Sequence, residues 1–69
     1  MQFLVNNIKS SVVKGIAYSN QKLTVQLVDR VYTYDKVPAN VAVEFLNSES
    51  KGKFYGQNIK GEYDLVENN

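Results

Sequence analysis

Residues 50–63 gather the side chains most suited to binding a negatively charged ligand. This stretch, SKGKFYGQNIKGEY, combines three lysines with three aromatic rings, two side-chain amides and several glycines. Ammonium groups donate charge-assisted hydrogen bonds to phosphate oxygens, and glycine lets a backbone approach a ligand closely. The composition therefore predicts a binding site for an anion, although it does not name the ligand.

The segment Ser50-Lys51-Gly52-Lys53 forms the basic end of this stretch. If a helix begins here, its free N–H groups and its dipole favour an anion. The alternative is a serine that only caps a helix start, followed by solvated lysines. The order of residues is not that of a P-loop, which needs an earlier glycine and Gly-Lys-Ser/Thr.

Tyr32 and Tyr34 are a second candidate feature, because residues two apart on a strand point to the same face. Paired rings on a sheet can stack nucleobases, as in RNA-binding sheets. Tyrosines under a helix are equally ordinary core residues whose hydroxyls reach the edge. The sequence leaves both interpretations open.

Further along, Tyr55, Asn58 and Lys60 can extend the site. The amide of Asn58 can hydrogen-bond to the edge of a base or a ribose, and Lys60 can bind a second phosphate. In the alternative, Ile59 and Tyr63 pack on the sheet while Asn58 ends the helix in a left-handed conformation. The predicted ligand-binding residues are Tyr32, Tyr34, Ser50, Lys51, Gly52, Lys53, Tyr55, Asn58 and Lys60.

Catalysis and metal binding have little support in this composition. The chain has no histidine and no cysteine, so the common zinc ligand sets and disulfides are absent. Its seven carboxylates show no paired spacing on one predicted element. We therefore expect a non-catalytic protein without a cofactor or a metal.

The length of 69 residues predicts a single domain, 1–69, with its core at about 10–66. So short a chain buries only about 60% of its unfolded surface, and oligomerisation is a common remedy. We therefore expect a homo-oligomer. A basic signal-peptide start and an apolar run of about 20 residues are both missing, so we expect a cytoplasmic protein with no membrane partner.

Charge is distributed unevenly along the chain. Residues 1–60 hold all eight basic and four of the seven acidic residues, giving 8 − 4 = +4, and the remaining acids follow. This excess suits a phosphate-bearing partner but is far below that of a typical duplex-DNA binder. A compact ligand fits it better than a long nucleic acid.

Three strands are predicted before the middle of the chain, over 11–18, 22–28 and 31–34. Asp29-Arg30 leaves room for a tight hairpin between the last two. Ser10 and Ser11 precede the first strand, where serine commonly begins an element, although their hydroxyls can also bind a phosphate.

Helices follow the Val37-Pro38 step, because proline favours the first turn of a helix. An apolar stripe predicts an amphipathic helix over 38–47, and Ser48 or Ser50 can cap a shorter helix over 51–58. A short strand can follow over 63–66. The predicted fold is α+β: a three-stranded antiparallel β-meander packed against one or two short helices, with an extra short C-terminal strand.

These motifs, in this order, resemble the KTSC domain family. The resemblance rests on Tyr32-Thr33-Tyr34, the Val37-Pro38 step, residues 50–55 and residues 58–63, and it covers about 10–63. The family is named for a C-terminal extension of some lysyl-tRNA synthetases and also occurs as stand-alone bacterial and phage proteins. The resemblance implies an α+β fold, and RNA binding is the function usually suggested for the family.

Three functions follow from these observations. The first is a module that binds a nucleotide through the lysine, glycine and tyrosine residues, as a phage-type sponge that sequesters a nucleotide immune signal. The second is an RNA-binding module that uses the Tyr32/Tyr34 face. The third is a protein-interaction module in which a sheet edge or the segment 3–5 pairs with another chain.

Overall fold

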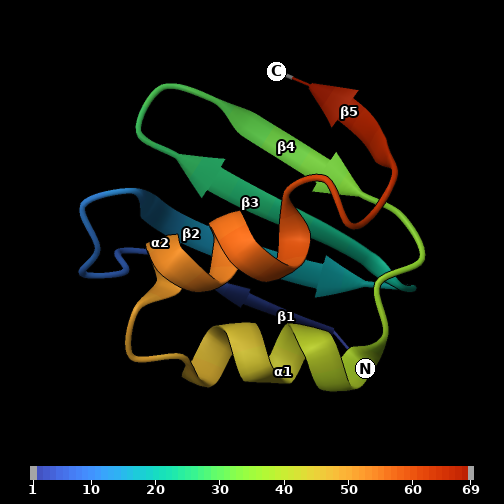
Figure 1. Ribbon diagram of the computed structural model, residues 1–69, viewed down its shortest axis with the longest axis horizontal. Coiled ribbons are helices and arrows are strands. Elements are labelled where there is room, and N and C mark those ends of the chain that lie inside the picture. The colour runs from blue at the N-terminus through green and yellow to red at the C-terminus, as the bar shows by residue number, and fades with distance from the viewer. Residues whose placement is uncertain (1, 69) are drawn as a thin grey trace.

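A single antiparallel sheet of five strands, in the order β1-β2-β3-β4-β5, forms the centre of the molecule (Figure 1). The computed structural model describes residues 2–68. Two α-helices and a π-helical turn connect β4 to β5 and cover one face of the sheet. The elements are β1 Gln2–Val5, β2 Val13–Ser19, β3 Lys22–Leu27, β4 Val31–Tyr34, α1 Ala39–Asn47, α2 Lys51–Phe54, η1 Tyr55–Ile59 and β5 Leu65–Asn68.

The α+β class and the antiparallel meander are as predicted: the three predicted strands are present as β2, β3 and β4, and the predicted C-terminal strand is present as β5. The strand β1, which extends the sheet beside β2, was not predicted. In β1, Phe3 lies opposite Tyr18 of β2, and their rings stack at 5.8 Å. The segment 3–5 is therefore paired within its own chain. Its short apolar run gave no alternation by which a strand could be recognised. β5 lies two residues beyond the predicted position of the last strand.

Alternation along β3 assigns its two faces. Leu23 and Val25 are fully buried on the face that the helices cover, whereas Thr24 is on the uncovered face and shares a hydrogen bond with Thr33 of β4. Asn20 and Gln21, with φ of 52° and 63°, make the turn into β3. Two consecutive residues with positive φ give the tight turn that suits the twist of a hairpin.

The helix α1 begins directly after Pro38, as the sequence predicted to within one residue. The carbonyl of Pro38 accepts hydrogen bonds from the N–H groups of Val41 and Ala42. Ala42 and Phe45 lie on the buried stripe of the helix, and both are inaccessible to solvent. The buried hydrophobic core consists of Val13, Ile16, Tyr18, Leu23, Val25, Tyr34, Val37, Ala42, Phe45, Tyr55 and Ile59.

The second predicted helix, 51–58, is not a continuous α-helix. After one α-helical turn it widens into η1, where the N–H of Lys60 donates to the carbonyl of Tyr55 across five residues. Ser50 occupies the N-cap position, but its side chain makes no capping hydrogen bond, so the predicted serine cap is wrong. The left-handed residue that follows is Gly61, with φ of 82°, and not Asn58.

Two glycines of this second helical segment give a matched test of packing. A methyl group on Gly56 would meet no atom within 4 Å, whereas on Gly52 it would lie 3.3 Å from Cβ of Val12. We expect Gly56→Ala to raise the free energy of unfolding by up to about 1 kcal/mol, since glycine is unfavourable inside a helix. Gly52→Ala should gain less or lose stability. Urea unfolding of both variants checks this, and equal gains would contradict it.

Candidate anion-binding site

Two segments that are far apart in the sequence line one hollow of about 360 Å³. One is the loop before β2 and the other leads into α2, and in Figure 1 they meet on the side where α2 begins. We call this hollow the lysine hollow. Its lining residues are Lys9, Ser10, Ser11, Val12, Glu49, Ser50, Lys51, Gly52 and Lys53.

The absence of a side chain at Gly52 allows the two walls of the lysine hollow to meet. A Cβ at this position would lie 3.3 Å from Cβ and 3.4 Å from Cγ2 of Val12. The shorter distance is tighter than most real contacts of a Cβ atom, so Val12 would have to shift by a few tenths of an ångström to admit a side chain at this position. The glycine predicted to let a ligand approach also brings two segments of the protein together.

Ser10 organises the loop wall of the hollow. Its Oγ accepts hydrogen bonds from the N–H groups of Val12 and Val13, both at 3.2 Å. This is the polar strand start that the sequence favoured over phosphate binding. The neighbouring Ser11 is exposed, so its hydroxyl is the one on this wall that faces solvent.

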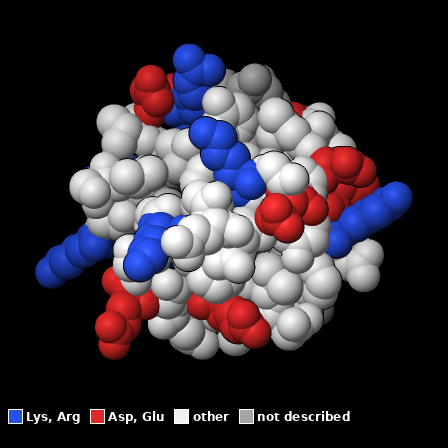
Figure 2. Space-filling model, viewed as in Figure 1, with Lys and Arg blue, Asp and Glu red and all other residues white. Residues whose placement is uncertain are grey.

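The charges around the lysine hollow are predominantly positive. Three lysines and one glutamate line it, giving 3 − 1 = +2. Lys9 and Lys53 are exposed. Lys51 is half-buried, and its Nζ donates to the carbonyl of Ser48 at 3.0 Å. Lys9 and Lys53 are thus the cations that can turn to a ligand. Elsewhere on the helix-bearing face, positive and negative side chains are interspersed (Figure 2).

Two predicted ligand-binding tyrosines are core residues. Tyr34 is 4% exposed and Tyr55 is 5% exposed, and their hydroxyl oxygens lie 2.6 Å apart. Burial raises the pKa of Tyr55 well above its usual value, and this hydrogen bond is the second largest cause. Neither ring can stack on a ligand in this arrangement, because Tyr34 on β4 and Tyr55 on η1 meet each other in the core between the sheet and the helices.

Tyr32 lies at the margin of the core. Its ring is half-buried, with its centroid 6.4 Å from that of Tyr34. The neighbouring Tyr32 side chain raises the pKa of the exposed Arg30 guanidinium. The pair Tyr32/Tyr34 therefore shares a face, as predicted, but this face is the covered one.

The remaining predicted site residues lie outside the lysine hollow. Asn58 is exposed on η1 and lines a different hollow of about 240 Å³ with Glu44 and Tyr63. Lys60 is exposed just after η1 and does not line either hollow. The structure thus brings together Ser50, Lys51, Gly52 and Lys53, and separates them from the other five predicted residues.

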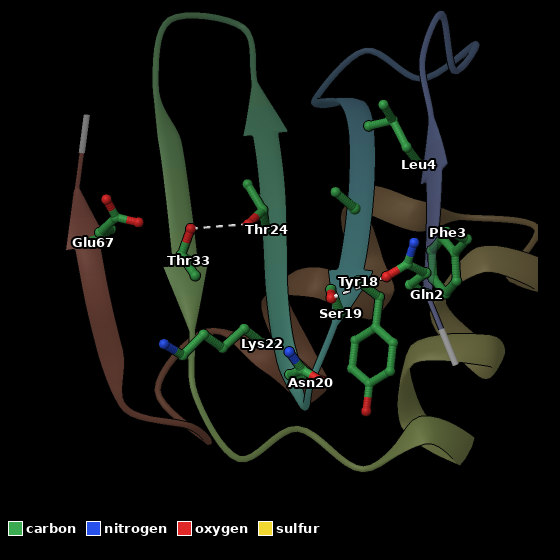
Figure 3. Close-up of a pocket in the computed structure, with 11 residues that line it drawn as sticks. Gln2, Phe3, Leu4, Tyr18, Ser19, Asn20, Lys22, Thr24, Thr33 and Glu67 are labelled. Atoms are coloured by element: carbon green, nitrogen blue, oxygen red, sulfur yellow. Dashed lines mark hydrogen bonds between the residues drawn. The ribbon is translucent and has the colours of Figure 1, made fainter.

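The uncovered face of the sheet carries a larger hollow, of about 560 Å³ (Figure 3). Thr24 and Thr33 share a hydrogen bond of 2.9 Å at its centre, so these hydroxyls are already partnered. Lys22 and Glu67 contribute one charge of each sign. Size alone favours this hollow, but the charge to hold an anion is in the lysine hollow.

Two further findings concern metal-binding clusters and membrane-spanning helices. Among residues 2–68, side chains of His, Cys, Asp and Glu do not gather in groups of three or more that could hold a metal ion. Within the same range, every helix is too short or too polar to cross a membrane.

Sequence reasoning missed Lys9 and Glu49 as members of the site. Both flank segments that had been considered, since Lys9 precedes Ser10-Ser11 and Glu49 precedes Ser50. Lys9 could have been predicted from the alternative interpretation in which the neighbouring Ser10 and Ser11 bind a phosphate. The contact between the two segments, however, depends on how the loop before β2 folds, and this is a tertiary feature.

Comparisons with known proteins agree with the resemblance seen in the motifs. The family model of the KTSC domain matches residues 9–63. The structure is similar to the crystal structure of a KTSC domain protein from Yersinia pestis, with a TM-score of 0.87 and 27% sequence identity over 97% of each chain. Curated proteins gave no significant match.

Proposed function

The chain belongs to the KTSC domain family, and we propose that it is a non-catalytic module that binds a compact, phosphate-bearing ligand in the lysine hollow. The observation that carries this proposal is the convergence of two distant segments on one hollow with a charge of +2. The side chains and not the helix dipole would bind the anion, because α2 is only four residues long.

The size of the lysine hollow supports a small ligand. Its volume of about 360 Å³ falls at the lower end of the range for small-molecule sites, roughly 300–1,000 Å³. A mononucleotide is a ligand of this kind, and a module that binds it without turnover would sequester it. The earlier expectation of a sponge for a nucleotide signal is a more specific form of the same proposal.

The burial of the tyrosines makes the RNA-binding alternative less favourable than the binding of a compact ligand. Single-stranded RNA is usually held by exposed rings on a sheet together with a long basic groove. Here Tyr34 and Tyr55 are buried, and charges of both signs alternate on the face that Figure 2 shows. A compact anion needs neither feature.

Removing the exposed ammonium of Lys53 tests the proposed function. A hydrogen bond to a charged group contributes about 1.5–3 kcal/mol, so we expect Lys53→Ala to weaken binding at least about tenfold. Isothermal titration with pyrophosphate and a panel of nucleoside monophosphates measures this. Lys22→Ala, which alters an exposed lysine on the opposite face, is the control. Unchanged affinity in Lys53→Ala would exclude the lysine hollow as the site.

A further inference from the structure

We infer that the lysine hollow selects a ligand with two different ends: a phosphate for the lysines and a pair of N–H or O–H donors for the carboxylate of Glu49. This inference rests on the proposed function and deepens it, because it names nucleotides as the preferred ligand class over simple inorganic anions.

The carboxylate of Glu49 is the acidic group that lines the lysine hollow. It belongs to the same short segment as Ser50, Lys51 and Lys53, directly before α2, and its side chain is exposed. The ammonium of Lys51 is directed to the main-chain carbonyl of Ser48 at 3.0 Å. Glu49 lines the same hollow as the exposed Lys9 and Lys53, so a ligand bound to these lysines shares the hollow with its carboxylate.

An ionised carboxylate changes which ligands such a hollow can bind. Its two oxygens only accept hydrogen bonds at neutral pH, so it repels a phosphate and attracts paired donors. A nucleotide satisfies both demands, because its phosphate is separated from the ribose diol and from the N–H groups of a base such as guanine. Pyrophosphate offers no such donors and must bear the repulsion.

A site that hydrogen-bonds a ligand donor rejects analogues that lack it, because the acceptor of the site is then left unpaired. The carboxylate of Glu49 is exposed and can be hydrated when no donor meets it, so the effect is smaller than in a buried site. We expect wild-type protein to bind a nucleoside monophosphate about two to five times more tightly than pyrophosphate. Substitutions in the helices or strands outside the lysine hollow should leave this preference unchanged.

Replacing Glu49 by its neutral isostere separates the two effects. We expect Glu49→Gln to bind pyrophosphate about three to ten times more tightly, since the repulsion is gone, and to bind the preferred nucleotide more weakly. Titrations with GMP, dGMP and ribose 5-phosphate identify the donors, because dGMP lacks the diol and ribose 5-phosphate lacks the base. Glu44→Gln, which neutralises an exposed carboxylate at the separate hollow beside Asn58, should change nothing.

The outcomes distinguish this inference from the function on which it rests. If wild-type protein binds neither pyrophosphate nor any nucleotide, the proposed function fails and the inference fails with it. If binding is present and sensitive to Lys53→Ala, but Glu49→Gln strengthens all ligands equally or changes none, only the inference is overturned. Opposite changes for pyrophosphate and nucleotide support it.

Discussion

Phe45→Ala should lower the free energy of unfolding by about 3–5 kcal/mol. Phe45 is inaccessible to solvent, and its ring stacks on those of Phe54 at 5.4 Å and Tyr55 at 6.5 Å. Truncating a buried phenylalanine costs about 3–5 kcal/mol. A domain of this size has a total stability of roughly 3–10 kcal/mol, at about 0.05–0.15 kcal/mol per residue. The expected loss is therefore a large share of the total stability of the protein.

Thermal and urea unfolding followed by circular dichroism would measure this loss. Leu46→Ala is the matched control, because Leu46 is the next residue of α1 and is only half-buried. We expect the control to lose less than half as much stability. Similar losses in both variants would mean that the ring stack between α1 and the second helical segment does not hold the core together.

The buried hydroxyl pair of Tyr34 and Tyr55 should produce the next largest effect. Their oxygens are 2.6 Å apart in the core, so removing either hydroxyl leaves the other without its partner. An orphaned buried polar group costs about 1–3 kcal/mol, whereas removing both partners can be nearly neutral. We expect Tyr34→Phe and Tyr55→Phe each to destabilise the protein by this amount, and the double variant to be more stable than either single one.

A double-mutant cycle from urea unfolding tests this expectation directly. The coupling between the two positions should be at least about 1 kcal/mol. Additive losses would mean that each hydroxyl finds another partner once its neighbour is gone. Since both rings remain in every variant, the cycle reports the hydrogen bond and not the packing of the rings.

The elements that the sequence predicted well are those with a clear period or a strong terminator. Strand β3 alternates cleanly, and Pro38 defines where α1 begins, so both were located to within a residue or two. The strand β1 and the π-helical turn were not foreseen. A four-residue apolar run has no recognisable period, and the extra residue of a π turn depends on how Tyr55 and Ile59 reach the core together.

The site was harder to predict than the fold, because neighbours in a sequence need not share a surface. Successive residues of a helix point in different directions, so Lys53 is exposed while Tyr55, two positions later, is buried. The other wall of the lysine hollow comes from the loop before β2. Its approach depends on the contact between Gly52 and Val12, which no local pattern reveals.

The order of the strands also determines when the lysine hollow can exist as the chain folds. Each strand pairs with its neighbour in the sequence, so β2, β3 and β4 can associate through short loops that close quickly. The hollow, in contrast, needs residues 9–12 and 49–53 to meet, and these residues are far apart in the sequence, so the second helical segment must first pack against the sheet. A ligand bound there would therefore stabilise only the fully folded chain, and its binding would be thermodynamically linked to folding as a whole.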